Sequence, residues 1–305
     1  WRTYTVPGPG EPGNETWPED TWRTGGASVW ITGSFDPELN LTYWGTGNPG
    51  PWVGDARPGD NLYTNSVVAL DVDTGELKGF HQYHWNGSWD WDEVSAPLLI
   101  DVNRDGRTVK SLVHPARNGY LWLLERTENS INFVDAEPYV FQNVFASIDS
   151  DTGRPEYNSE HKPGLGKRAT FCPSLWGGKD WPPAAYSPQT GYLYIPANEN
   201  FCSSMEGVPV EYEPGQGFTG AVRRHFVQEG ADHLGEIQAW NLDTGEKVWS
   251  HEFASHNWGP ILTTGGGLLF AGGTNDRYFR AFDATSGDVL WEQRTNSGVT
   301  GVPSS

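Results

Sequence analysis

The 305-residue chain is strongly acidic, because 39 Asp and Glu residues outnumber 20 Lys and Arg residues and give a formal net charge of −19 at pH 7. A nucleic-acid partner requires a basic surface, so this charge excludes that class of partner. The sequence contains no run of roughly 18 apolar residues and therefore predicts no membrane span. With 38 Gly, 22 Pro and 16 Trp, the composition favours short strands joined by turns, an all-β fold.

The two ends of the chain suggest an incomplete protein. The chain begins at Trp1 without an initiator Met and ends in the loop-like segment 299–305. We therefore expect a fragment cut at both ends, in which the missing signal peptide carries no information.

A hairpin unit recurs along the chain, made of an apolar strand, an Asp/Asn-x-x-Thr/Ser-Gly turn and a second strand. The last two copies are 42 residues apart and end on Trp249 and Trp291, whereas the first copy has Gly79 at that position. The Gly of the turn takes a backbone conformation that other residues resist. The clear copies lie at 69–78, 239–249 and 281–291, and weaker ones at 124–127 and 187–191.

A period near 42 residues is typical of one four-stranded blade of a β-propeller. The terminal Trp of each copy would pack between neighbouring blades, and a solenoid of hairpins is the alternative geometry. Asp105-Gly106 and Asn118-Gly119 predict further hairpins, and no long helix is expected. The segment 101–106 superficially resembles an EF-hand loop, but its twelfth position is Leu112 and not Glu, so we interpret it as a tight turn.

The repeat and several unrepeated segments together resemble the alcohol dehydrogenases that depend on pyrroloquinoline quinone (PQQ), the relatives of methanol dehydrogenase. The segment 66–71 leans towards the ethanol-type branch. The resemblance covers nearly the whole chain, and the joint pattern is highly specific. The segments that carry it are 25–30, 43–52, 57–61, 89–92, 114–119, 172–174, 177–183 and 256–259.

This resemblance implies part of an eight-bladed propeller with tryptophan-docking motifs, in which residues 1–305 form a single incomplete domain. It implies a periplasmic enzyme that oxidises a primary alcohol to an aldehyde with PQQ and passes electrons to a cytochrome c. A homodimer stays open as the assembly. We expect the fragment alone to be inactive, because the preceding part of the family's chain supplies a glutamate metal ligand and further cofactor contacts. The alternative is a non-catalytic scaffold that resembles the outer-membrane assembly lipoprotein.

By resemblance, five residues contact the cofactor. An indole stacks well on a planar quinone, and Trp30 matches the family's stacking Trp, although a Trp is otherwise most often core. Arg117 would stabilise negative charge on the reduced quinone, with a surface Arg as the alternative. Trp258 matches a second indole at the cofactor edge, and Ser28 a weaker hydrogen-bond donor. Asp180 departs from the family's Asn, and its negative charge beside an anionic cofactor puts cofactor affinity in doubt unless Lys179 offsets it.

The resemblance also implies a metal site and a catalytic base. Asn48 matches a ligand that binds through its amide oxygen, and Asp90 matches the base that takes the alcohol proton. Asp92 resembles the extra carboxylate of lanthanide-using members, so we expect a lanthanide ion with calcium as the alternative. If the segment is extended, Asp90 and Asp92 point to one face and need a cation between them. A simple turn at Asn48 and an exposed acidic strand end are the alternatives.

Cys172 and Cys202 are the only cysteines. Their number alone permits one disulfide or two buried free thiols. The resemblance pairs them in a structural disulfide, in keeping with an oxidising compartment. No Cys-x-x-Cys-His motif occurs, so no covalent haem is expected in this chain.

Overall fold

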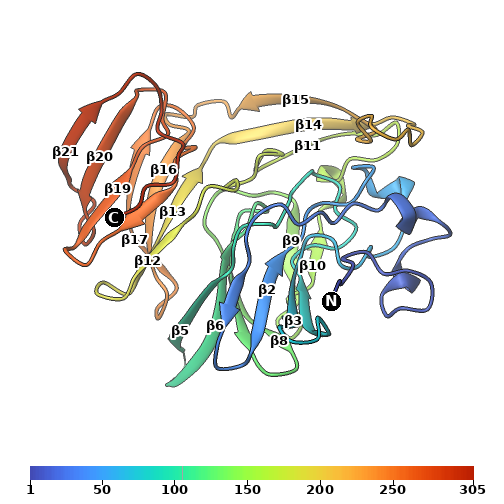
Figure 1. The fold of residues 1–305 in the computed structure, drawn as a ribbon. Helices are drawn as coiled ribbons and strands as arrows, with labels where there is room; N and C mark the ends of the chain where they lie inside the picture. The colour runs from blue at the N-terminus through green and yellow to red at the C-terminus, as the bar shows by residue number, and fades with distance from the viewer. Residues whose placement is uncertain (105) are drawn as a thin grey trace.

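The computed structural model describes residues 1–104 and 106–305, and these residues form strands with four one-turn 3-10 helices (Figure 1). The expected all-β fold is confirmed. Within the described ranges, no helix has the length and hydropathy needed to cross a membrane. The 3-10 turns are η1 (Asn14–Thr16), η2 (Thr21–Thr24), η3 (Gly54–Ala56) and η4 (Ser159–His161).

Sheet I is an antiparallel sheet in the strand order β1-β2-β3-β4. Alternation is clearest in β2, where Leu41, Tyr43 and Gly45 are buried while Thr42 and Trp44 between them are partly exposed. Strands with this pattern bury one face against a neighbouring sheet. The strands are β1 (Ser34–Asp36), β2 (Leu41–Gly45), β3 (Ser66–Asp71) and β4 (Leu77–Gln82).

Sheet II has the strand order β5-β6-β7-β8. The Asn118-Gly119 turn joins β6 to β7 as expected, with Gly119 at φ +93°. Of the Asp105-Gly106 turn, Asp105 lies outside the described residues, whereas Gly106 has φ +78° and the flanking Arg104 and Arg107 are paired. The EF-hand-like segment is therefore a hairpin. The strands are β5 (Leu98–Arg104), β6 (Arg107–Pro115), β7 (Tyr120–Arg126) and β8 (Ile131–Pro138).

Sheets III and IV occupy the C-terminal part of the chain and lie side by side in Figure 1. Sheet III has the order β12-β13-β16-β17 and sheet IV the order β18-β19-β20-β21. The strands of sheet III are β12 (Ala185–Ser187), β13 (Tyr192–Asn198), β16 (Gly235–Asn241) and β17 (Glu246–Phe253). Those of sheet IV are β18 (Ile261–Thr263), β19 (Leu268–Ala271), β20 (Tyr278–Asp283) and β21 (Val289–Arg294).

Two smaller sheets interrupt the order of these sheets along the chain: β9, β10 and β11 lie between sheets II and III in the chain, whereas β14 and β15 lie between β13 and β16 of sheet III. One pairs β9 with β10, and the other, the insert sheet, has the order β11-β14-β15 and extends along the upper side of Figure 1. Their strands are β9 (Phe145–Ile148), β10 (Pro155–Tyr157), β11 (Arg168–Phe171), β14 (Phe201–Gly207) and β15 (Ala221–Val227).

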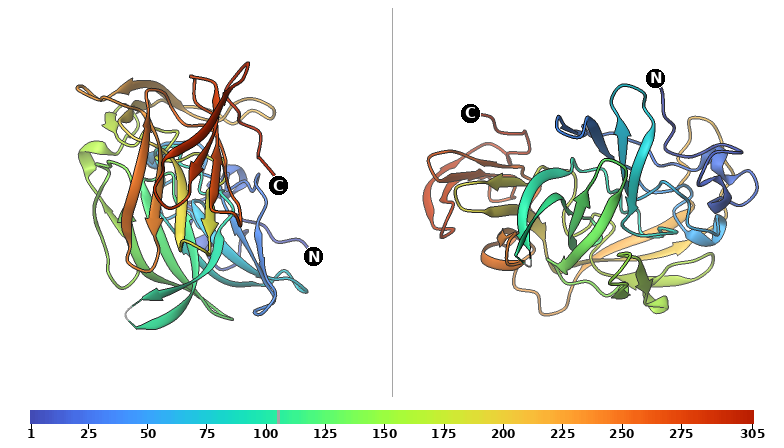
Figure 2. Two further views of the ribbon diagram at one scale, coloured as in Figure 1. Left: turned by 90° about the vertical axis from the view of Figure 1, so that its left-hand side faces the viewer. Right: turned by 90° about the horizontal axis from the view of Figure 1, so that it is seen from below.

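The four main sheets follow one another in chain order, as the view from below in Figure 2 shows, and each pair shares an apolar layer. Tyr43 and Val67 of sheet I pack with Leu112 of sheet II, and Phe253 of sheet III packs with Phe282 of sheet IV. Between sheets II and III the layer is formed by Val102, Val113, Leu123, Leu193, Ile195 and Trp240. Stacked four-stranded sheets of this kind are the blades of a partial propeller.

The tryptophan-docking contact is present between sheets III and IV. The Trp249 indole lies against the turn of the next copy, and its Nε1 donates to Ala284 O at 3.3 Å. A Cβ on Gly287 would lie 2.7 Å from Trp249, so only glycine allows this approach. At the other end, Trp1 lies against the Gly75 turn in the same way, and its Nε1 donates to Val72 O at 2.8 Å.

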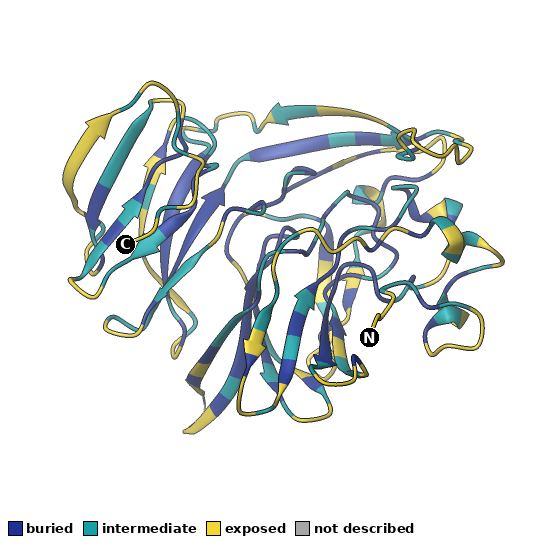
Figure 3. Ribbon diagram, viewed as in Figure 1, coloured by how far each residue is buried: buried dark blue, intermediate teal, exposed yellow. Residues whose placement is uncertain are grey.

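The expectation that Trp291 packs between sheets is wrong. Trp291 is 49% exposed, and all six residues of β21 are exposed (Figure 3), because no further sheet of the described residues covers this strand as sheet IV covers Trp249. One further copy of the Asp-x-x-Thr-Gly turn, at residues 149–153, was not predicted from the sequence. Asp149 Oδ1 accepts from the Thr152 backbone N at 2.8 Å and from Thr152 Oγ1 at 2.7 Å, the bonds that Asp71 makes with Thr74.

Candidate active site

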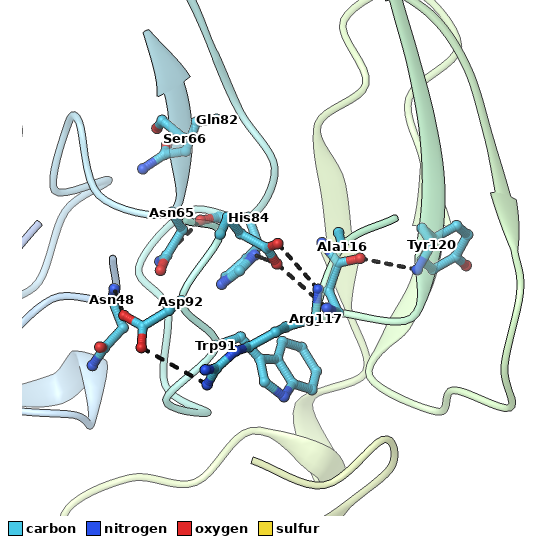
Figure 4. Close-up of polar contacts among 12 residues, drawn as sticks. Asn48, Asn65, Ser66, Gln82, His84, Trp91, Asp92, Ala116, Arg117 and Tyr120 are labelled. Atoms are coloured by element: carbon cyan, nitrogen blue, oxygen red, sulfur yellow. Dashed lines mark hydrogen bonds and ion pairs between the residues drawn. The ribbon is translucent and has the colours of Figure 1, made fainter. Parts of the chain in front are cut away.

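Three loops that are distant in sequence meet at one edge of sheets I and II. They follow β2, β4 and β6, of which β2 and β4 run in the same direction because each is antiparallel to β3 between them. The loops bring together Asn48, Asp92 and Arg117, which are labelled in Figure 4. The predicted site residues from these loops are therefore close in space.

Asp92 joins the three loops. Its Oδ1 accepts a hydrogen bond from the Asn48 backbone N at 2.8 Å, and its Oδ2 lies 3.8 Å from Arg117 Nη1. Burial raises the pKa of Asp92, while Arg117 and the Asn48 N–H oppose that rise. Gly47 makes room for this arrangement, since a Cβ there would lie 2.6 Å from Asp92 Oδ1 and 3.1 Å from Ser28 Oγ.

Asp90 lies in the same loop with a left-handed backbone, at φ +62°. The premise that residues 90–92 form an extended segment is therefore wrong. The carboxyl group of Asp90 nevertheless interacts electrostatically with that of Asp92. Burial, followed by the charge of Asp92, holds the pKa of Asp90 well above its ordinary value, while Arg117 and Arg223 lower it.

Arg117 is the cation at the centre of the site. Its Nη2 pairs with Asp180, and its Nη1 donates to Asp90 O at 3.2 Å. Burial alone would lower the pKa of Arg117, but the charges of Asp180, Asp92 and Asp90 together raise it. Gly177 packs on Arg117, because a Cβ there would lie 2.6 Å from the Arg117 Cβ.

The charge of Asp180 is matched by Arg117 and not by Lys179. Lys179 is buried, and its Nζ donates to the Asp180 backbone O at 2.7 Å and to Ser95 Oγ at 3.0 Å. Burial lowers the pKa of Lys179 to about 7, while Asp180 opposes the fall. A cleft of about 640 Å³ opens beside these residues, with Ile31, Ser95, Lys179 and Trp181 among its walls.

Glu93 is absent from the set of site residues that the sequence predicted. It is 1% exposed, and its carboxylate accepts from the backbone N of Arg117 at 3.1 Å and of Asn118 at 3.3 Å. His114 Nε2 lies 2.9 Å from Glu93 Oε2, and His84 Nδ1 lies 3.6 Å from Oε1. Glu93 thus fixes the turn that carries Arg117. Its burial follows from the tertiary fold and leaves no separate sequence signal.

The aromatic candidates are less enclosed. Trp30 is 43% exposed, so its indole is partly accessible to a ligand. Trp258 is partly buried and meets Trp176 edge to face, with ring centroids 5.3 Å apart. Arg223, a second residue absent from the predicted set, lies over the Trp52 ring at 5.0 Å and lowers the pKa of Asp90.

The predicted disulfide between Cys172 and Cys202 is confirmed, with the two Cα atoms 4.5 Å apart. It ties the end of β11 to β14 within the insert sheet. Directly after it, Ser174 O accepts from Trp91 Nε1 at 2.8 Å, and Leu175 O accepts from Arg117 at 3.5 Å. The disulfide therefore braces the loop that supports the site.

The residues present fit a metal ion, and the exposed Trp30 and the Arg117 guanidinium are the groups that would receive a quinone. The three carboxylates of Asp90, Asp92 and Asp180 outnumber the guanidinium groups of Arg117 and Arg223 near them, so a cation would offset the excess negative charge. The Asn48 side-chain N donates to Pro49 O at 3.1 Å, and within the described part of the chain its Oδ1 accepts no hydrogen bond. Carboxylate and amide oxygens are the ligands that hard cations prefer.

The stacked blades and this set of residues define a propeller of the quinoprotein class. The chain belongs to the PQQ-dependent dehydrogenase family: residues 1–131 and 251–305 match the family described as "Glucose/ethanol/alcohol dehydrogenase, beta-propeller domain". The "Quinoprotein alcohol dehydrogenase PedH" of Pseudomonas putida is 38% identical, over 96% of this chain and 49% of that protein. The "Lanthanide-dependent methanol dehydrogenase" of Methylacidiphilum fumariolicum is also 38% identical, over 97% of this chain and 48% of that protein.

Solved structures agree with this assignment. A "Europium-containing methanol dehydrogenase" superimposes with a TM-score of 0.90 at 36% identity, covering 98% of this chain and 52% of that one. The quinohemoprotein alcohol dehydrogenase of Comamonas testosteroni gives a TM-score of 0.90 at 30% identity, covering 100% of this chain and 48% of that one. The chain spans about half the length of the curated relatives it matches.

Proposed function

We propose that this chain belongs to an enzyme that oxidises a primary alcohol to an aldehyde with PQQ and a bound metal ion. The observation that carries the proposal is the meeting of Asp92 with the Asn48 loop and Arg117, beside the buried Asp90. A non-catalytic scaffold has no need of buried carboxylates around Arg117, since their burial costs free energy. The family match independently favours the enzyme.

Asp90 is the proposed catalytic base. Its carboxylate takes the hydroxyl proton of the alcohol, while Arg117 holds the Asp90 backbone in place through the carbonyl. The chemistry that PQQ supplies when bound is the acceptance of hydride, with the metal ion as a Lewis acid.

Asn48, Asp90 and Asp92 are the proposed metal ligands of this chain. By resemblance, a glutamate from the preceding part of the family's chain joins them. Three carboxylates then match a trivalent lanthanide ion, whereas calcium, the alternative, would leave one negative charge in excess beside an anionic cofactor.

Five residues are proposed to hold the cofactor. Trp30 stacks on the quinone with its accessible indole, and Trp258 borders its edge. Arg117 donates hydrogen bonds and positive charge to it, Asp180 sets the position of Arg117, and Ser28 donates a further hydrogen bond.

The proposed electron acceptor is a cytochrome c, and the proposed location is the periplasm. The acidic surface suits a basic partner, since a net charge of −19 attracts it over a distance. The Cys172–Cys202 disulfide supports an oxidising compartment.

The substitution Asp90→Asn in the full-length enzyme tests this function. We expect kcat with a dye acceptor to fall by roughly a thousandfold, because the base is lost while the shape of the side chain is kept. PQQ binding, followed by absorbance at saturating metal, should change little. Asp151→Asn, at an exposed turn, is the matched control and should leave both unchanged. Full turnover by the Asp90→Asn enzyme with bound PQQ would refute the role of Asp90.

A further inference from the structure

A second group of metal-ligating side chains lies away from the active site, on sheet III. His233 precedes β16, Glu236 lies on β16, and Glu252 lies on β17. One ligand atom from each of the three residues lies within 4.8 Å of the other two. Around a tetrahedral zinc ion, neighbouring ligand atoms are about 3.4 Å apart, so small side-chain movements bring these three into a coordination sphere.

The register of the sheet holds the two carboxylates together. Glu236 and Glu252 are directly paired across β16 and β17, and they therefore point to the same face. Two like charges directly opposite each other on a sheet destabilise it. Glu236 is 4% exposed, and Lys247 Nζ approaches its carboxylate only to 4.0 Å. The nearer cation is protonated His233, with Nε2 2.7 Å from Glu236 Oε1 and Nδ1 3.9 Å from Glu252 Oε2, and a metal ion would take the place of its proton.

Neighbouring groups already orient the ligands. Asp232 Oδ1 lies 2.7 Å from His233 Nδ1, which favours a proton on that nitrogen and makes Nε2 the nitrogen that would bind a metal ion. His233 Nε2 faces Glu236 Oε1 at 2.7 Å. Gln238 Nε2 donates to Glu236 Oε2 at 2.7 Å, so Oε1, which shares a proton with His233 Nε2, is the oxygen that a metal ion would bind in place of that proton. A carboxylate behind the histidine and a fixed carboxylate ligand are the outer-shell partners that metal sites use.

We propose that His233, Glu236 and Glu252 form a second metal site that binds a divalent transition ion, zinc foremost. Imidazole selects zinc over calcium and over the lanthanides, which prefer an all-oxygen sphere. Three protein ligands leave a fourth position for water, on the side where Glu252 is exposed.

The site would join two parts of the fold. The connection from β15 to β16 runs along the upper side of Figure 1 from the insert sheet to sheet III and carries His233. A metal bound by His233 and Glu252 fixes this connection to the hairpin β16–β17. Because β15 also carries Arg223, the metal would steady the insert sheet that borders Asp90.

Zinc titration of the full-length protein tests the site independently of alcohol oxidation. The protein is stripped with a chelator, its oxygen-ligand site is saturated with lanthanum, and zinc is added in a calorimeter. We expect one equivalent of zinc per chain in the wild type. His233→Ala should weaken this binding at least tenfold, and zinc K-edge X-ray absorption should detect one imidazole that the variant lacks.

Glu229→Gln is the matched control, because Glu229 is exposed in the same connection and outside the cluster. It should bind zinc as the wild type does. Glu252→Gln, at a side chain that is 57% exposed, should also weaken binding and serves if His233→Ala does not fold. No zinc equivalent in the wild type, equal affinity in wild type and both cluster variants, or a spectrum without imidazole would each overturn the proposal.

Discussion

Arg117 and Asp180 form a buried ion pair that links the β6–β7 turn to the loop after the disulfide. Their side chains are only 10% and 8% exposed, and Asp180 Oδ1 also accepts from the Trp181 backbone N at 2.7 Å. The pair explains how an Asp is accommodated where the resembled family has Asn. Part of the positive charge of Arg117 is consequently used inside the protein and is not available to an anionic ligand.

Asp180→Asn should therefore bind PQQ more tightly. Removing one negative charge near an anionic cofactor is expected to lower the dissociation constant of PQQ roughly tenfold, equivalent to about 1.4 kcal/mol of binding free energy. The free energy of unfolding of the apoprotein should fall by about 2 kcal/mol, because Arg117 loses its partner in a buried place. Fluorescence titration with PQQ and urea unfolding measure the two effects. Weaker PQQ binding would contradict the charge argument.

Asp92→Asn should change the metal preference of the enzyme. The amide oxygen can still accept from the Asn48 backbone N, so the loop geometry is kept while one negative charge is lost. We expect lanthanide affinity to fall by about a hundredfold and lanthanide-dependent activity to disappear, while calcium-dependent activity persists. The measurement is alcohol oxidation by the apoenzyme during titration with each ion. Equal lanthanide activity in variant and wild type would rule out Asp92 as a ligand.

Gly287→Ala should reveal the energy of the tryptophan-docking contact. Gly287 has φ +78°, and the added Cβ would lie 2.7 Å from Trp249. Gly191→Ala is the matched control, since Gly191 has φ +71° and no heavy atom within 4 Å of its Cβ position. Backbone strain should lower the free energy of unfolding of both variants by about 1 kcal/mol. Overpacking should lower that of Gly287→Ala by about 1–3 kcal/mol more. Urea unfolding gives both values, and equal losses would show that the docking contact adds no stability.

His81→Phe should reduce the acid sensitivity of the fold. His81 is buried among Tyr83, Trp122 and Phe133, and burial lowers its pKa to about 3, with the charge of His114 adding to the fall. A free histidine has a pKa of about 6.5, so below that pH the imidazole of residue 81 is protonated in the unfolded chain but stays neutral in the folded protein. The stability that neutral His81 contributes is complete above about pH 6.5 and declines as pH falls towards 3.

Between pH 7 and pH 5 this linkage costs the wild type about 2 kcal/mol, which His81→Phe should recover. Denaturant unfolding at a series of pH values measures the difference. Parallel pH dependences in the two proteins would show that His81 carries no part of the acid sensitivity.

Much of the fold could be predicted from the sequence because its signals are local. The Asp/Asn-x-x-Thr-Gly turns at Asp71 and Asn241 close through hydrogen bonds within four residues. Neighbouring positions in the sequence are therefore enough to predict their hairpins. The same logic found the Asn118-Gly119 turn. It failed for Trp291, because whether a docking indole is covered depends on the next sheet and not on its own motif.

The sequence by itself determined which residue types stand in the site, and the matching motifs named Asn48, Asp90, Asp92 and Arg117. Only the tertiary structure decided how their charges are arranged. Pairing of Arg117 with Asp180, burial of Glu93 under the Arg117 turn and the approach of Asp92 to the Asn48 loop join residues up to 63 positions apart. Electrostatic interactions depend on distance and burial in three dimensions, and a linear motif contains neither.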